Sequence, residues 1–216
     1  MHCDETDDPS SRHIETLARA RRIAWASGTG QRVSTAVHAL DGQLLRLEAH
    51  PADGRVGRER GEELLINITI QGRHDTYPKR RGMTRVPELM AAGITVAMGH
   101  DCVMDPWYSL GSGDMLEVAS MGLHVAQMTG QDGMRACFDA VTVNAAKILH
   151  LDGYGIAPGN RADFVLLQAR DPVEAIRLRA TRLAVFRAGR LVAETPPSTA
   201  SLRVEGRPSH VDWTLR

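Results

Sequence analysis

The stretch ITVAMGHDCVMDPWYSLG, residues 94–111, decides the fold class of this chain. Its first five residues are apolar or β-branched and are followed by a glycine, which predicts a short buried strand over 94–98. His100 and Asp101 follow that strand directly. In a (β/α) barrel the carboxyl ends of the strands face the active-site mouth. The chain also opens with residues 2–5, HCDE, a second group of metal-binding and proton-transferring side chains. Two such groups predict a metal-dependent hydrolase.

The composition argues against several classes of protein. Acidic and basic residues balance at 26 each, so no net charge draws the chain toward nucleic acid or an anionic membrane. No apolar run approaches the roughly 20 residues that span a bilayer, and the acidic N-terminus is unlike a signal peptide. The cysteines Cys3, Cys102 and Cys137 form no CxxC pair and are odd in number, which favours reduced thiols. We therefore expect a cytoplasmic protein that binds neither nucleic acid nor membrane.

Hydrophobic spacing predicts that helices and strands alternate along the chain, which is typical of an α/β fold. One segment breaks the pattern: residues 38–63 are rich in charged residues and glycine, and their apolar residues follow neither the helical nor the strand periodicity. This indicates a solvated loop, but a loop of that length is unusual inside a compact domain. The expected helices are 10–27, 86–92, 115–128 and 135–149, and the expected strands are 64–70, 94–98, 162–167 and 183–192, the last with a turn at 188–190.

Four motifs occur in the order typical of one enzyme family. They are HCDETDD (2–8), INITIQGRHDTYPKRRG (66–82), GHDCVMDPWYSLGSGDML (99–116) and MGLHVAQM (121–128). Together they resemble the bacterial cytosine deaminase branch of the metal-dependent amidohydrolase superfamily, and residues 141–167 resemble that superfamily's C-terminal signature. The resemblance covers nearly the whole chain except residues 33–63.

This resemblance implies a fold. Residues 1–150 would form the C-terminal part of a (β/α)8 TIM-barrel-like hydrolase, and residues 151–216 would add C-terminal strands to a small composite β-sandwich. The family also tends to form homo-oligomers.

The resemblance further implies roles for five residues. His2 and Asp101 would be metal ligands, Glu5 would shuttle a proton to the substrate ring, and Trp107 and Cys102 would border the bound base. The implied reaction is hydrolytic deamination of cytosine or a related nucleobase-like small molecule in pyrimidine metabolism, with Fe²⁺ or Zn²⁺ as cofactor. The residue types suit it, since a divalent ion lowers the pKa of bound water to about 7 and a nearby carboxylate relays protons.

The chain departs from the family in three places. It contains no HxH pair, which carries metal ligands in the family's opening barrel strand. Cys102 stands where the best-known cytosine deaminase has a second aspartate. Because that position borders the substrate, isocytosine-like or other amino-substituted rings fit the sequence as well as cytosine does. Residues 33–63 stand where the family has a helix–strand segment that contains a catalytic histidine. His38 is the nearest histidine to that position, and some codon choices give family-like sequence in a shifted frame, which suggests a frame-shifted segment.

A second hypothesis is an inactive truncated fragment, or a subunit that requires another chain. A complete barrel takes about 250 residues, and His2 with Asp101 are fewer than the roughly three protein ligands usual at a catalytic zinc. This hypothesis predicts weak metal retention and little deamination by the chain alone. Plainer interpretations also exist: Asp101 as a turn cap, His2 and Glu5 as solvated terminal residues, and Cys102 as a small pocket wall.

Overall fold

The structure is a computed structural model that describes residues 2–3, 36–37, 59–70, 72–79, 84–91 and 93–211, with side chains described from Leu65 onward within those ranges. The predicted helix over 10–27 lies outside the described residues. The chain divides into two compact units, residues 1–152 and residues 153–216.

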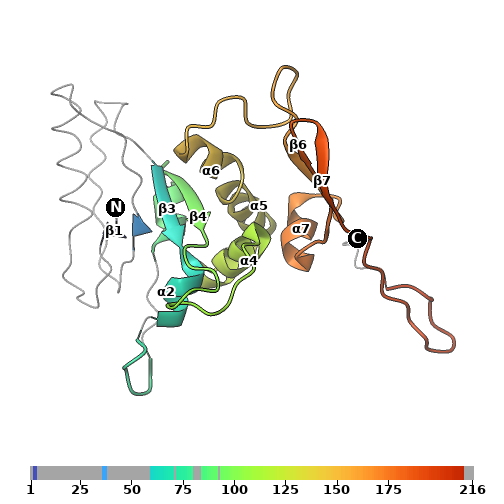
Figure 1. The fold of residues 1–216 in the computed structure, drawn as a ribbon. Helices are drawn as coiled ribbons and strands as arrows, with labels where there is room; N and C mark the ends of the chain where they lie inside the picture. Colours follow the sequence, from blue (N-terminus) through green and yellow to red (C-terminus); the bar gives the residue numbers. More distant parts are fainter. Residues whose placement is uncertain are drawn as a thin grey trace. The chain divides into compact units, whose positions relative to one another are not determined.

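The first unit contains a four-stranded parallel sheet (Figure 1). The strand order is β1-β2-β3-β4, and the register places His2 level with Ala36, Ala36 with Gly61, and Gly61 with Ala97. Parallel strands end at a common carboxyl edge, so the carboxyl ends of β1 and β4 lie at the same edge of the sheet. The strands are β1 (His2–Cys3), β2 (Ala36–Val37), β3 (Glu59–Glu63) and β4 (Thr95–Gly99).

β4 confirms the strand predicted at 94–98, displaced by one residue. Its three central residues, 96–98, are buried, as a continuous apolar run requires. The neighbouring strand was not expected, because β3 reads ERGEE and lies in the segment without a period. β3 nevertheless pairs with β4 over five residues, since ladder hydrogen bonds join main-chain groups whatever the side chains are.

The stretch LLINITI forms a helix, α2 (Leu64–Ile70), and the strand predicted there is wrong. A short apolar run with β-branched residues fits a buried strand and a buried helix equally well by periodicity. The preceding segment, β3, forms the strand beside β4, and the apolar residues after it form the helix. Leu65, Ile66 and Asn67 are buried, whereas Thr69 and Ile70 at the end of the helix are exposed.

Four further helices belong to the first unit, and α4, α5 and α6 lie on one side of β3 and β4 (Figure 1). In α4 the buried positions include Leu116, Ala119 and Leu123, as the spacing predicts. The single helix expected over 135–149 is two helices, because Thr142 leaves the helical conformation (φ −126°, ψ −96°) and its hydroxyl donates to the carbonyl of Phe138 at 2.8 Å. The helices are α3 (Val86–Ala91), α4 (Met115–Val125), α5 (Gln131–Ala140) and α6 (Val143–Ile148).

The second unit is built on a three-stranded antiparallel sheet. The rings of Phe164 and Phe186 stack across two of its strands with centroids 4.6 Å apart. Ala188 and Gly189 both have positive φ, as a two-residue hairpin turn requires, so the stretch predicted over 183–192 is a hairpin of two strands. The elements are β5 (Phe164–Leu167), α7 (Pro172–Leu178), β6 (Arg182–Arg187) and β7 (Arg190–Glu194).

Within the described ranges, no helix is both long enough and apolar enough to cross a membrane.

Candidate active site

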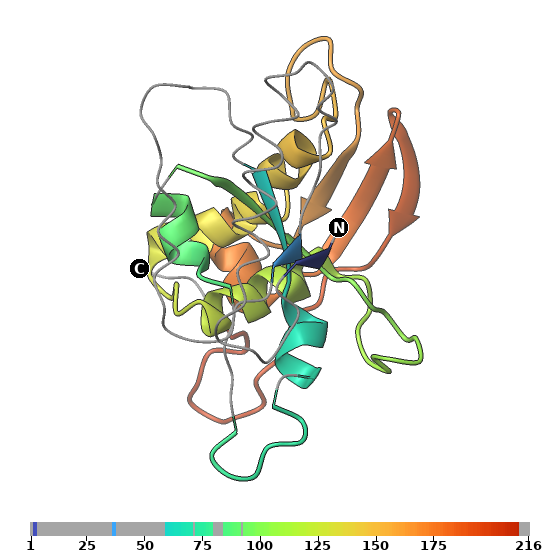
Figure 2. The ribbon, with the colours of Figure 1, turned by 90° about the vertical axis from the view of Figure 1, so that its left-hand side faces the viewer.

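The loop that follows β4, residues 100–113, leaves the sheet at its carboxyl edge and projects from the unit (Figure 2). Its first two residues differ sharply in burial. His100 is 7% exposed, whereas the side chain of Asp101 is exposed. Asp101 has a φ of +60°, a left-handed conformation that few residues other than glycine adopt. Such outliers persist only where the surroundings hold them, and they gather at functional sites.

Three contacts hold His100. Its Nδ1 lies 2.9 Å from the main-chain carbonyl oxygen of Cys102, and because a carbonyl only accepts, Nδ1 is the donor. The imidazole and the ring of Tyr108 meet edge to face, with centroids 6.3 Å apart and planes at 64°. Gly111 packs so closely that a Cβ there would lie 2.3 Å from Cε1 of His100 and 2.7 Å from Nε2. The imidazole is therefore enclosed by its own loop.

Asp105 folds the middle of the loop into a turn. Its Oδ1 accepts hydrogen bonds from the main-chain N–H groups of Trp107 (2.9 Å) and Tyr108 (3.0 Å), and Met104 N–H donates to the carbonyl of Leu110 at 3.0 Å. Desolvation raises the pKa of Asp105, but the bonds from Tyr108, Cys102 and Trp107 outweigh it and lower that pKa below its ordinary value. The turn leaves the Trp107 side chain 73% exposed.

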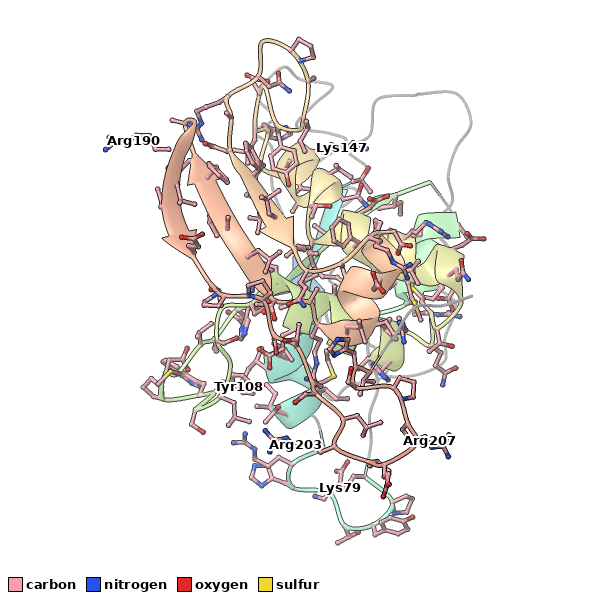
Figure 3. The ribbon with its side chains drawn as sticks, turned by 90° about the vertical axis from the view of Figure 1, so that its right-hand side faces the viewer. Lys79, Tyr108, Lys147, Arg190, Arg203 and Arg207 are labelled. Carbon is pink, nitrogen blue, oxygen red and sulfur yellow. The ribbon has the colours of Figure 1, made fainter. Side chains whose placement is uncertain are left out.

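Tyr108 attaches the loop to the helices beside it (Figure 3). The side chain is 6% exposed. Burial raises the pKa of its hydroxyl and the charge of Glu117, in α4, raises it further, while a hydrogen bond with Thr69, in α2, lowers it. Glu117 also accepts a hydrogen bond from the Ser112 hydroxyl at 3.1 Å. The loop is thereby fixed to α2 and α4.

Three of the five residues singled out from the sequence lie in this one loop. Asp101 and Trp107 are exposed and Cys102 is half-buried. His2 lies in β1, where it pairs with Ala36 of β2, but its side chain is outside the described part of the structure. Glu5 and His38 both lie outside the described residues.

The described side chains do not assemble a metal site by themselves. Among them, no group of three or more histidine, cysteine, aspartate or glutamate residues lies close enough together to hold an ion. Asp101 can supply one carboxylate ligand, a donor type that both zinc and iron accept. A metal site that included Asp101 would need ligands from outside the described side chains.

His100, Tyr108 and Gly111 hold the loop; the sequence places His100 beside the candidate ligand but indicates no supporting role for it, and it does not single out Tyr108 or Gly111. The one signal in the sequence was a histidine directly after a buried strand and directly before the candidate ligand. The glycine gave no signal, because its importance comes from the imidazole packed against it.

Comparison with known proteins finds several deaminases and amidohydrolases to which this chain is similar. The chain is 29% identical over 210 residues to a pterin deaminase of Rhizobium rhizogenes, a match that covers 94% of this chain and 46% of that protein. The fold is similar to the crystal structure of 5-methylcytosine deaminase from Klebsiella pneumoniae liganded with phosphonocytosine (TM-score 0.79, 37% identity, 94% of this chain and 49% of that chain). It is also similar to N-isopropylammelide isopropylaminohydrolase from Burkholderia multivorans (TM-score 0.67, 26% identity, 87% and 46%).

The chain thus spans about half the length of the relatives it matches. Residues 1–193 match the amidohydrolase family over most of the chain, including the loop after β4 and nearly all of the hairpin of the second unit. On this match, and with the deaminase likeness that the motifs predict, the chain belongs to the amidohydrolase family.

Proposed function

We propose that this chain forms part of a hydrolytic deaminase of amino-substituted heterocyclic rings. The observation that carries the proposal is Asp101, an exposed carboxylate on left-handed main chain at the carboxyl edge of a parallel sheet. Cys102 and Trp107 lie in the same ordered loop. Two relatives are named as deaminases of pterin and of 5-methylcytosine, and both rings carry an amino group on a carbon beside a ring nitrogen. The shared chemistry is replacement of that amine by water.

Each candidate residue has a role suited to this chemistry. Asp101 and His2 are proposed metal ligands, and the ion, Fe²⁺ or Zn²⁺, would supply a water of lowered pKa. Glu5 is the proposed group that moves a proton to the ring, as carboxylates do in acid–base catalysis. Trp107 offers an exposed aromatic face on which a planar base can stack. Cys102 would border the ring, whether this is cytosine, isocytosine or a larger base.

The proposed enzyme has a barrel fold in which β1 and β4 are strands of one sheet. Neighbouring strands lie about 4.8 Å apart, so β1 and β4 would be about 14 Å apart in a flat sheet of this order. A closed or curved sheet would shorten that distance, and on this proposal residues 1–150 form part of a (β/α)8 barrel with His2 and Asp101 at one mouth. Residues 151–216 would belong to a β-sandwich, and the enzyme would act in the cytoplasm, in pyrimidine metabolism, as a homo-oligomer.

A second candidate is a chain that does not catalyse alone. It is favoured by the lack, among the described side chains, of three clustered metal-binding residues. A hydrolytic zinc site usually has about three protein ligands. On this alternative the chain would hold metal weakly and would release no ammonia without a partner.

Metal content and ammonia release from the purified chain test the proposal. After loading with Zn²⁺ or, without oxygen, with Fe²⁺, we expect weak metal binding that depends on Asp101. Asp101→Asn should lower the affinity at least about tenfold, since one charged ligand is lost. Ammonia release is then measured with cytosine, 5-methylcytosine, isocytosine and pterin.

Asp139→Asn is the matched control, because Asp139 is an exposed carboxylate on α5 in the same unit. This variant should bind metal as the parent chain does. Equal metal affinity in the Asp101 and Asp139 variants would contradict the ligand role. Asp101-dependent metal binding without ammonia from any of the four rings would favour the second candidate.

A further inference from the structure

His100 and Cys102 close a small ring of atoms around Asp101. The imidazole Nδ1 donates to the Cys102 carbonyl at 2.9 Å, so one hydrogen bond joins the residues on either side of Asp101. Such a bond limits the φ and ψ angles open to the residue between them. That residue has a φ of +60°, a left-handed conformation that is unfavourable for most side chains with a Cβ and that aspartate tolerates better than most. The bond is therefore placed to hold this conformation.

The imidazole in turn is held in place from two further sides. Tyr108 meets it edge to face, and Tyr108 is itself buried beside Thr69 and Glu117. Gly111 covers Cε1 and Nε2 so closely that no other residue fits without moving the ring. The ring thus transmits the position of α2 and α4 to the main chain at Asp101.

We propose that His100 is the positioning residue of Asp101: the enclosed imidazole fixes the left-handed main chain, which directs the carboxylate to the place where it binds a metal ion. This inference rests on the proposed ligand role of Asp101. It assigns a function to a buried side chain that needs no contact with substrate or metal.

Gly111→Ala tests the enclosure from the opposite side of the ring. Gly111 and Gly113 both have positive φ, +87° and +71°, so alanine strains the main chain at either position. Only at Gly111 would the new Cβ strike the imidazole, because nothing lies within 4 Å of a Cβ at Gly113. Gly113→Ala is therefore the matched control for main-chain strain.

The first readout needs no metal. Amide hydrogen exchange at residues 100–108 should be at least about fivefold faster in Gly111→Ala than in Gly113→Ala, because the strained conformation at Asp101 loses its support. His100→Phe, which keeps an aromatic ring but has no donor, should behave like Gly111→Ala. Exchange at these amides that is equal in Gly111→Ala and Gly113→Ala would overturn the inference.

The second readout is the affinity for Co²⁺, followed by its visible absorption. His100→Phe should weaken it about tenfold, a loss typical when a group supporting a ligand is removed. His100→Asn should retain most of it, because the asparagine amide N–H can occupy the place of Nδ1–H and reach the Cys102 carbonyl. Equal weakening by both variants would contradict positioning through this hydrogen bond.

The two proposals fail in different ways. If Asp101→Asn leaves Co²⁺ affinity unchanged, or if the parent chain binds no Co²⁺, the proposed metal role of Asp101 is wrong. Hydrogen exchange in the glycine pair still decides whether His100 holds the main chain at Asp101. If Co²⁺ binding depends on Asp101 but not on His100, the metal role stands and the positioning role is overturned.

Discussion

The side-chain amide of Asn144, in α6, donates a hydrogen bond to the main-chain carbonyl of Val96, in β4, at 3.0 Å. Val96 is 1% exposed, so water cannot replace this donor without entering the core. The bond ties the helical layer to the strand that leads into the candidate active-site loop. Asn144 belongs to the C-terminal signature by which the sequence resembles the superfamily. At least one residue of that signature therefore joins the helices to the sheet.

Asn144→Ala should lower the free energy of unfolding by about 1–2 kcal/mol, because the carbonyl of Val96 would remain buried without its donor. Urea denaturation followed by circular dichroism measures the loss. Lys147→Ala, on the exposed side of the same helix, is the control and should change stability by less than about 0.5 kcal/mol. Equal losses in the two variants would show that the hydrogen bond adds no stability.

Asp171 caps helix α7, where its Oδ1 accepts from the N–H of Glu174 at 2.9 Å. Asp171→Ala should cost about 1 kcal/mol of stability in the second unit, and Asp171→Ser, which keeps an acceptor, should cost much less. Thermal unfolding of the variants measures both. Glu205→Ala replaces an exposed acidic residue elsewhere in that unit and should have no effect. A serine variant as unstable as the alanine variant would argue against a cap.

Elements that follow one clear rule could be predicted from the sequence. β4 is a continuous apolar run, and α4 has apolar residues at helical spacing after a capping aspartate, Asp114. The hairpin of β6 and β7 turns at Ala188 and Gly189, where the expected turn lies. In each case the signal and the structure it specifies lie within a few neighbouring residues.

Other elements depend on what lies beside them. The charged stretch ERGEE forms strand β3 and the apolar stretch LLINITI forms a helix, and no local property of either segment indicates this. Helix α7 is not predicted from the sequence, although Asp171, Pro172 and Glu174 are typical of a helix start. The helix has only seven residues, about two turns, which is too short for its apolar residues to show a clear helical periodicity.

The site could be predicted only in part for a similar reason. Asp101, Cys102 and Trp107 lie close together because they are close in sequence, so their shared loop was foreseeable. The support of Asp101 was not, because it depends on the imidazole of His100 packing against Gly111. A packing contact of this kind has no characteristic spacing in the sequence.

Cys137 should be nearly inert toward thiol reagents. It is fully buried, and burial raises the pKa of its thiol to about 11. At pH 8 only about one thiol in a thousand would be ionised even if the reagent reached it. Cys102, by contrast, is half-buried in the loop after β4.

Two double variants measure this difference with a disulfide reagent at pH 8. Cys3→Ser with Cys102→Ser leaves Cys137 alone, and Cys3→Ser with Cys137→Ala leaves Cys102 alone. We expect the first to react at least about a hundredfold more slowly when folded. In urea both should react at similar rates, which excludes a difference in reagent quality. Equal rates in the folded state would show that Cys137 is accessible.

The hairpin of the second unit should lose order in acid, and the pKa of Asp163 sets the pH at which this happens. Its Oδ1 accepts from the main-chain N–H of Ala188 at 2.6 Å, and Arg161 bonds Oδ2 through Nε, also at 2.6 Å. The bond from Ala188 is the largest cause of a pKa lowered below 3.8, and Arg161 adds to it. A lowered pKa means that the folded hairpin prefers the ionised carboxylate.

The sign of the pH dependence follows from that preference. The contribution of Asp163 to stability is complete above the ordinary pKa of 3.8 and is lost as the pH falls below it, through the lowered pKa of the folded state. The amide shift of Ala188, followed by NMR from pH 7 to pH 2, should therefore show one transition below 3.8. Asp163→Asn keeps an acceptor for the Ala188 N–H but cannot titrate, so its Ala188 shift should stay flat. A transition at or above pH 3.8 in the parent chain, or one that persists in Asp163→Asn, would mean that another acid controls the turn.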